Sequence, residues 1–208
     1  MNEHSDRGRL LPDPGWPADR AAPGELELIR RFCNTINREH GADRFTTPAG
    51  FDRWLATESL AAVRPSRADL ERIGIVRDAL HDLTVANRER RPAPDAWRRI
   101  AGMLQQAAYV IAADDDGLVL VPRADAPVDA FLAHLALICG RARDDGTFGR
   151  LTSCAHCEWT LYDSSKNRNG RWCALCGGRH NARAYRQRQR RSDTAVTQPA
   201  PRAAPSST

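Results

Sequence analysis

Hydrophobic residues between positions 24 and 147 recur every three or four residues, the interval at which side chains share one face of a helix. The first predicted helix runs from residue 24 to about residue 39. Its apolar face consists of Leu26, Ile29, Cys33 and Ile36. Cys33 is interpreted as a small core residue, because a free cysteine in an apolar stripe packs like a hydrophobic side chain. This part of the chain is therefore predicted to be a helical domain.

Capping residues mark the starts of later helices. Thr47-Pro48 combines a cap with a proline suited to the first turn, and Ser66 with Asp69 resembles a capping box. Further helices are predicted from Pro94 and over residues 127–143. The buried faces of these four helices are predicted to contain Phe51, Trp54, Leu55, Leu70, Ile73, Val76, Leu80, Leu83, Trp97, Ile100, Met103, Leu104, Val128, Phe131, Leu132, Leu135, Ile138 and Cys139.

The pattern changes between the last two of these helices. Apolar runs at 109–111 and 118–121 flank an acidic turn at 114–117, which predicts a β-hairpin. The predicted fold class is mainly α. A helical domain (24–147) with one small β-hairpin precedes a small four-cysteine zinc finger (148–191), which combines a β-hairpin or knuckles with a basic C-terminal helix.

Two Cys-x-x-Cys pairs, Cys154/Cys157 and Cys173/Cys176, are separated by fifteen residues. Each two-residue gap directs two thiolates at one ion, and a linker of this length brings the second pair back to complete a tetrahedron. Four thiolates with no open position favour Zn²⁺ bound for structure. The alternatives are a disulfide framework, a redox dithiol or zinc-responsive thiol switch, and a site in which His156 or His180 replaces a thiolate.

Positive charge is concentrated in the same region. The chain has a net charge of +5, yet residues 166–191 contain nine basic residues and no acidic one. A run of one sign beside a zinc knuckle indicates a polyanionic partner. A helix after Gly177-Gly178 would suit the major groove or a phosphate backbone. The predicted nucleic-acid-binding residues are Lys166, Arg168, Arg171, Arg179, Arg183, Arg186 and Arg190, of which the last four share one helix face.

DNA is the expected partner of this basic region. RNA is the alternative, because Trp159, Tyr162, Trp172 and Tyr185 could stack on bases. A solubilising basic tail is the simplest alternative. A homodimer is one expectation, since a single finger binds DNA weakly and regulators are usually dimers.

The chain ends and the remaining motifs narrow the functional class. Residues 1–23 are proline-rich and aperiodic, residues 192–208 are rich in Pro, Ala, Ser and Thr, and both segments are predicted to be disordered. No signal-peptide core or transmembrane-length stretch occurs, so we expect a cytoplasmic protein without a membrane partner. No nucleophile elbow, phosphate-binding glycine loop, HExxH or deaminase pattern occurs, so we expect no enzyme.

The cysteine pairs stand in a wider set of motifs. Glu158-Trp159 follows the first pair, and then come the run 160–162 and Asp163 to Asn167. Arg171-Trp172-Cys173 opens the second pair, which ends in Cys176-Gly177-Gly178-Arg179. In these features the segment resembles the CGNR zinc-finger family of bacterial proteins. Gly178 stands where that family usually has Asn, and the last two cysteines are closer together than is common in it.

The upstream domain carries a looser resemblance. Phe32-Cys33-Asn34-Thr35, the stretch from Phe45 to Leu55, and Val76 to Leu80 are similar to the ABATE domain that usually precedes a CGNR finger. The resemblance implies a stress-responsive transcription regulator whose N-terminal domain senses a small ligand. Polar residues on apolar helices are the candidates for such a pocket, namely Asn34, Thr35, Arg77 and His81. Alternatively, Asn34 and Thr35 bond nearby backbone, while Arg77 and His81 lie at the surface.

Overall fold

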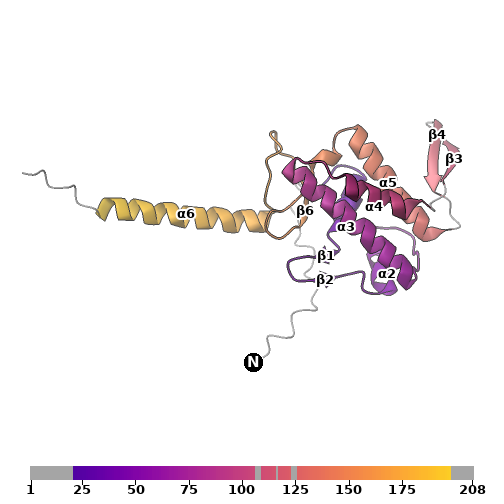
Figure 1. Ribbon diagram of the computed structural model, residues 1–208, viewed down its shortest axis with the longest axis horizontal. Helices are drawn as coiled ribbons and strands as arrows, with labels where there is room; N and C mark the ends of the chain where they lie inside the picture. Colours follow the sequence, from indigo (N-terminus) through magenta and orange to yellow (C-terminus); the bar gives the residue numbers. More distant parts are fainter. Residues whose placement is uncertain (1–20, 106–108, 116, 123–125, 198–208) are drawn as a thin grey trace, which may run out of the picture.

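The computed structural model of the chain describes residues 21–105, 109–115, 117–122 and 126–197. In these residues helices alternate with short antiparallel hairpins (Figure 1), and the predicted mainly α fold class is confirmed. The elements are α1 (Leu26–Cys33), β1 (Ile36–Asn37), β2 (Ala42–Asp43), α2 (Pro48–Thr57), α3 (Arg67–Glu89), α4 (Pro94–Leu104), β3 (Tyr109–Asp114), β4 (Gly117–Pro122), α5 (Pro127–Asp144), the 3₁₀ turn η2 (Phe148–Arg150), β5 (Leu151–Ser153), β6 (Thr160–Tyr162) and α6 (Ala174–Thr197).

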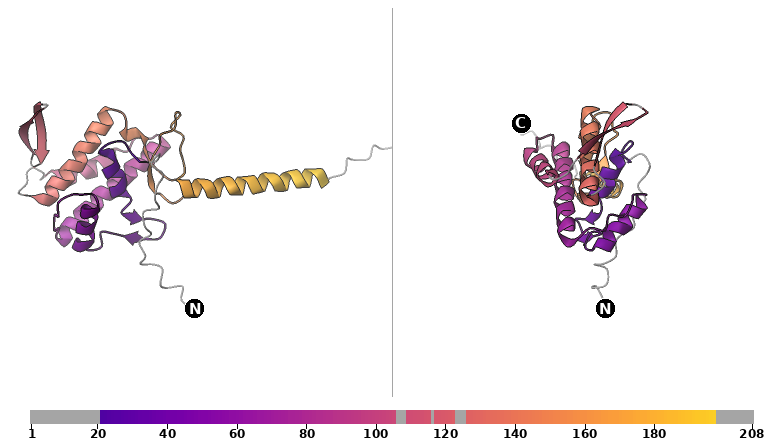
Figure 2. Two further views of the ribbon diagram at one scale, coloured as in Figure 1. Left: turned by 180° about the vertical axis from the view of Figure 1, so that it is seen from behind. Right: turned by 90° about the vertical axis from the view of Figure 1, so that its right-hand side faces the viewer.

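Helix α3 is the central element of the molecule. It contacts α1, α4 and α5, and its C-terminal half also packs against η2 and β5. The finger therefore lies beside the C-terminal end of α3, whereas α6 projects away from all other elements (Figures 1 and 2). No helix among the described residues has both the length and the apolar character needed to cross a membrane.

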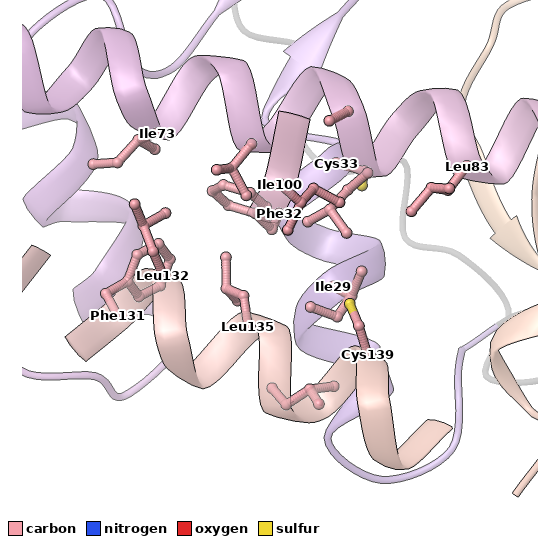
Figure 3. Packing of buried hydrophobic residues seen from close by; sticks show 14 of the residues in the cluster. Ile29, Phe32, Cys33, Ile73, Leu83, Ile100, Phe131, Leu132, Leu135 and Cys139 are labelled. Carbon is pink, nitrogen blue, oxygen red and sulfur yellow. The ribbon is translucent and has the colours of Figure 1, made fainter. Parts of the chain in front are cut away.

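The core of the helical domain lies between α1, α3 and α5 (Figure 3). Five aromatic rings gather at the α2 end of this core, with neighbouring centroids 4.9–6.2 Å apart; they belong to Phe32, Phe45, Phe51, Trp54 and Phe131. Cys33 is fully buried, and burial raises its pKa to about 12. The interpretation of Cys33 as a core residue is thus confirmed.

The predicted helix starts at Thr47 and Ser66 are confirmed. The Thr47 hydroxyl accepts a hydrogen bond from the Gly50 N–H at 3.1 Å. Ser66 and Asp69 form a reciprocal capping box, in which each side chain accepts from the other residue's N–H at 3.2 and 3.0 Å. Most of the predicted core positions are buried, but Leu70, Trp97, Met103 and Leu104 are only partly buried at its edge.

The predicted length of the first helix is wrong. Helix α1 ends at Cys33, and Ile36 lies half-buried in β1, which pairs with β2 in a hairpin that periodicity did not predict. The hydroxyl of Thr35 donates to the Phe32 carbonyl at 2.8 Å and also accepts from Arg77 of α3. Tertiary partners therefore end a helix that the apolar spacing alone would continue.

The predicted hairpin near residue 115 is confirmed, with β3 and β4 paired from Tyr109–Pro122 to Asp114–Gly117. It lies at the edge of the molecule opposite α6 (Figure 1). The predictions for the two chain ends are wrong in part. Residues 1–20 and 198–208 lie outside the described residues, but Ala22 is buried in the core and residues 192–197 continue α6, so neither segment is disordered over its whole predicted length.

Candidate metal centre and nucleic-acid surface

The first cysteine pair lies in a knuckle that extends the β5–β6 hairpin. The Cys154 N–H donates to the Trp159 carbonyl at 2.8 Å, and the Glu158 N–H donates to the Cys154 carbonyl at 3.1 Å. Glu158 has a φ of +60°, a left-handed conformation that lets the chain reverse after Cys157. These bonds place both sulfurs of the pair on the same side of the turn.

The second pair lies at the N-terminus of α6. This helix begins at Ala174, so Cys176 and both following glycines are helical, and the expected start after Gly178 is wrong. The Cys173 sulfur accepts a hydrogen bond from the Cys176 N–H at 3.4 Å. It therefore acts as a helix cap at the N-terminus of α6.

The four cysteines form one cluster. Their sulfur atoms all lie within 4.8 Å of one another, and the sulfurs of Cys157 and Cys173 are 3.7 Å apart. Zn–S bonds of about 2.3 Å place the sulfurs of a tetrahedral site about 3.8 Å apart, so the donor set fits a zinc ion. Among the described residues all cysteines are free thiols and no histidine joins the cluster, which contradicts the disulfide framework and the substitution of His156 or His180.

The thiols of the cluster do not ionise independently. Hydrogen bonds from the thiols of Cys157 and Cys173 lower the pKa of Cys154, and hydrogen bonds to Cys154 raise the pKa of Cys157. Burial raises the pKa of Cys176 to about 12. A bound dication would stabilise all four residues as thiolates and would hold the two halves of the finger together.

A small apolar cluster supports the cysteines. Leu161 is fully buried, and Trp159 and Trp172 pack partly buried against the sulfurs. The Trp172 ring also stacks on His180, with centroids 5.0 Å apart. A module of this size buries too little apolar surface to fold without a metal.

Asp163 shapes the loop between the pairs, as predicted. Its buried carboxylate accepts hydrogen bonds from the N–H groups of Ser165 and Gly170 at 2.9 and 2.8 Å. A Cβ at Gly170 would lie only 2.8 Å from a carboxylate oxygen of Asp163. This close approach explains why residue 170 is a glycine. The resulting turn of the loop exposes residues 166–169 at the surface.

Two of the four proposed pocket residues, Asn34 and Thr35, line one cavity, whereas Arg77 and His81 do not line it. Asn34 exchanges two hydrogen bonds of 2.8 Å with the Thr160 backbone, and His81 donates to the Glu158 carbonyl at 2.9 Å, so both join the domain to the finger. Arg77 is buried in a bidentate ion pair with Asp43 (2.7 and 2.6 Å). The alternative that Arg77 and His81 lie at the surface is also wrong.

The predicted nucleic-acid-binding arginines occupy two places. Arg179, Arg183, Arg186 and Arg190 are exposed along α6, which has no other element packed on its outer length (Figure 1). Lys166, Arg168 and Arg171 are exposed on the finger loop and face the C-terminal end of α3. There they meet Arg88, Arg90 and Arg91, which sequence reasoning missed because Glu89 makes that run look like a mixed, solvated helix end.

Comparisons with protein families agree with this architecture. The ABATE family, described as "Putative stress-induced transcription regulator", matches residues 26–144, and the CGNR zinc finger matches residues 150–189. No curated protein matches the chain. The ABATE match covers more than half of the chain, and the CGNR match contains all four clustered cysteines. The chain therefore belongs to the ABATE family and carries a C-terminal CGNR zinc finger.

Proposed function

We propose that the protein is a zinc-stabilised, DNA-binding transcription regulator and not an enzyme. One observation carries this proposal: a four-cysteine cluster holds the first turn of a long helix whose exposed length carries arginines and has no neighbour packed on it among the described elements. At 1.5 Å per residue, this helix spans about 36 Å, which is enough to cross a duplex. The bound zinc ion would have a structural role, because four thiolates leave no open coordination position.

The cysteines and the arginines of α6 would have different roles. Cys154, Cys157, Cys173 and Cys176 would hold the ion and fix the direction in which α6 leaves the finger. The α6 arginines would contact phosphates or base edges, and those that reach only phosphates add affinity without sequence preference. If about five to eight side chains meet phosphates, the slope of log K against log salt is about −4 to −7.

The experiment compares wild-type protein with Arg183→Gln/Arg186→Gln on genomic duplex fragments at several salt concentrations. We expect the double variant to bind more weakly and its salt slope to be less steep by about 2. Arg67→Gln is the matched control, because Arg67 is an exposed arginine at the far end of α3. Equal affinity of wild type and double variant would rule out α6 as the DNA-contacting element.

Competition distinguishes the RNA alternative. Trp159 and Trp172 pack around the cysteines, which leaves Tyr185 of α6 as an exposed aromatic ring. We expect unlabelled duplex DNA to displace labelled duplex more effectively than single-stranded RNA does. The thiol-switch alternative predicts release of zinc under mild peroxide, whereas a structural site retains it.

A cavity of about 220 Å³ supports regulation by a small ligand. It lies between the β1–β2 hairpin and the zinc knuckle, beside three of the clustered cysteines, and its wall includes Trp159, Leu175, Arg44, Arg179 and Glu39. Its size suits a small ligand with an apolar body, and the two guanidinium groups against one carboxylate suit an anionic end. A ligand there would touch both the helical domain and the first turns of α6, so binding could alter how the helix is presented.

Thermal unfolding with a panel of small aromatic carboxylates tests this site. We expect a hit to raise the unfolding temperature of the wild type but not of Ala42→Phe, which would fill the cavity. Gly102→Ala is the control, since a Cβ there meets open space. A hit that stabilises both variants equally would place the ligand elsewhere.

A further inference from the structure

A broad groove separates the C-terminal end of α3 from the finger loop. Its volume is about 1090 Å³, and one wall comes from residues 86–91 while the other comes from residues 166–171. The walls carry six basic side chains, from Arg88, Arg90, Arg91, Lys166, Arg168 and Arg171, against the single carboxylate of Glu89. Two segments more than seventy residues apart in sequence thus build one strongly positive surface.

Hydrogen bonds fix the two walls relative to each other. Arg90 donates to the carbonyls of Asn167 and Arg168 at 3.3 and 3.2 Å, and Arg88 donates to the carbonyls of Ser153 and Cys154 at 3.3 and 3.1 Å. Asn87 donates to the carbonyls of Phe148 and Leu151, both at 3.0 Å. The groove is therefore preorganised and not a chance gap between independent parts.

The charge of the groove is only partly neutralised. Glu89 is shared between Arg88 and Arg91, at 3.1 and 2.6 Å. Within the described residues, Lys166, Arg168 and Arg171 form no ion pair, and all three are exposed. The negative end of the α3 dipole accounts for basic residues on α3 itself, but it does not account for the three on the finger loop.

Two of these arginines occupy backbone positions that normally favour glycine or asparagine. Arg90 has a φ of +55° and Arg168 a φ of +49°, both in the left-handed region. An arginine carries a small conformational cost at such a position, and outliers of this kind concentrate at binding sites. Compared with glycine, an arginine at these positions adds positive charge, and Arg90 also adds its two hydrogen bonds to carbonyl groups.

The shape of the groove selects the class of ligand. An enclosed, largely apolar pocket suits a small molecule, whereas this groove is open, larger than most such pockets and lined by arginine, lysine and asparagine. These are the side chains that contact phosphate oxygens in DNA complexes. Arg171 lies three residues before the start of α6, and the end of α3 that forms the other wall lies on the side of the molecule from which α6 projects (Figure 1).

We propose that this groove binds the phosphodiester backbone of the same DNA duplex that α6 contacts, so that the ABATE domain forms part of the DNA interface through the end of α3. The inference rests on the proposed DNA-binding function and extends it to residues outside the finger. Zinc thereby has a second role, because the finger fold holds the 166–171 wall opposite α3. The DNA footprint is then wider than that of α6 alone.

The test measures duplex binding as a function of salt for Arg91→Gln and for Lys166→Gln/Arg171→Gln. None of these three side chains donates a hydrogen bond that holds the walls together. We expect the salt slope to fall by about 1 for the single variant and about 2 for the double variant. At 0.1 M salt the loss of one phosphate contact corresponds to roughly eightfold weaker binding. Hydroxyl-radical footprinting should show fewer protected sugars at one edge of the site.

Controls separate this inference from the proposed function. Arg98→Gln on α4 keeps wild-type affinity, because Arg98 lies outside the groove. Zinc content and unfolding temperature of each variant must match the wild type. Wild-type affinity for both groove variants, combined with weaker binding by Arg183→Gln/Arg186→Gln, would overturn the groove and leave the regulator intact. Absence of duplex binding by the wild type overturns both, and a loss confined to RNA binding overturns the DNA assignment.

Discussion

Single side chains with two partners determine how this protein is assembled. Asn34 follows the last turn of α1, and its amide group both donates to and accepts from the Thr160 backbone at 2.8 Å. The Asn34 side chain therefore bonds the backbone of β6 in the way that a neighbouring strand would. Thr35, its neighbour, receives a hydrogen bond from Arg77 at 3.1 Å. The ABATE-like residues at 34, 35 and 77 have structural partners inside the protein.

Asn34→Ala should destabilise the contact between the helical domain and the finger. The substitution leaves the N–H and carbonyl of Thr160 without their partners, and an unsatisfied buried group costs about 1–3 kcal/mol. Denaturant unfolding of the zinc-loaded protein measures the loss. Asn37→Ala is the control, since within the described part of the chain the Asn37 side chain bonds only the exposed His40 N–H, at 3.2 Å, and its effect should be far smaller. Equal effects would mean that Asn34 does not hold the finger.

Two glycines of the finger should respond to alanine in opposite ways. A Cβ at Gly170 would lie 2.8 Å from the buried Asp163 carboxylate, so Gly170→Ala should destabilise the finger and weaken zinc retention. A Cβ at Gly178 meets nothing within 4 Å, and Gly178→Ala should stabilise α6 by about 0.5–1 kcal/mol. Thermal unfolding measures both effects. A destabilised Gly178→Ala would contradict the open space around this position and would show that the fold itself requires the glycine.

Helix α6 depends on the metal more than any other element does. Its first turn is capped by a cysteine sulfur, and among the described elements none packs along most of its length. Helices in proteins gain most of their stability from tertiary packing, which the outer part of α6 does not have. The helical domain, by contrast, has a core that none of the four clustered cysteines joins. Metal removal should therefore destabilise the finger and α6 and leave the helical domain folded.

Chelation should make four of the six cysteines reactive. Cys154, Cys157, Cys173 and Cys176 lose their ion, whereas Cys33 and Cys139 stay in the intact core, where burial raises the pKa of each thiol. Titration with a thiol reagent before and after chelation counts the thiols, and circular dichroism should show a partial loss of helix. Rapid reaction of all six would mean that the helical domain unfolds together with the finger.

At the scale of the whole molecule, polar contacts join the domain and the finger into one body. His81 is buried at this junction between Glu158 of the finger and Arg38 of the domain. Burial, reinforced by the charge of Arg38, lowers its pKa below 6.5, although Glu158 and Asp82 oppose the shift. The folded protein therefore keeps His81 neutral where the unfolded chain binds a proton.

Stability should decrease on acidification because of His81. Its contribution is complete above about pH 6.5 and is lost as the pH falls through that value toward the lower pKa of the folded state. His81→Gln keeps a donor for the Glu158 carbonyl but does not titrate. The difference in unfolding free energy between wild type and His81→Gln should therefore shift against the wild type between pH 7.5 and pH 5.5. A constant difference would contradict the assignment.

Features that depend on local residue spacing could be predicted from the chain alone. The capping residues at 47 and 66, the periodic faces of α2 to α5, the β3–β4 hairpin and the two cysteine pairs were all predictable, because each is specified within a few residues. The same holds for Asp163, which bonds amides of its own loop. The sequence also predicted that α6 is basic, but it did not predict the residue at which this helix begins.

Long-range packing determines where distant residues meet. It ended α1 at Cys33, because Thr35 and Asn34 find partners on α3 and β6 that no local pattern reveals. It also divided the predicted basic residues between an exposed helix and a groove, and it added arginines of α3 to that groove. Electrostatic surfaces of this kind arise from the distances between folded segments, and those distances are fixed by core packing and by the metal.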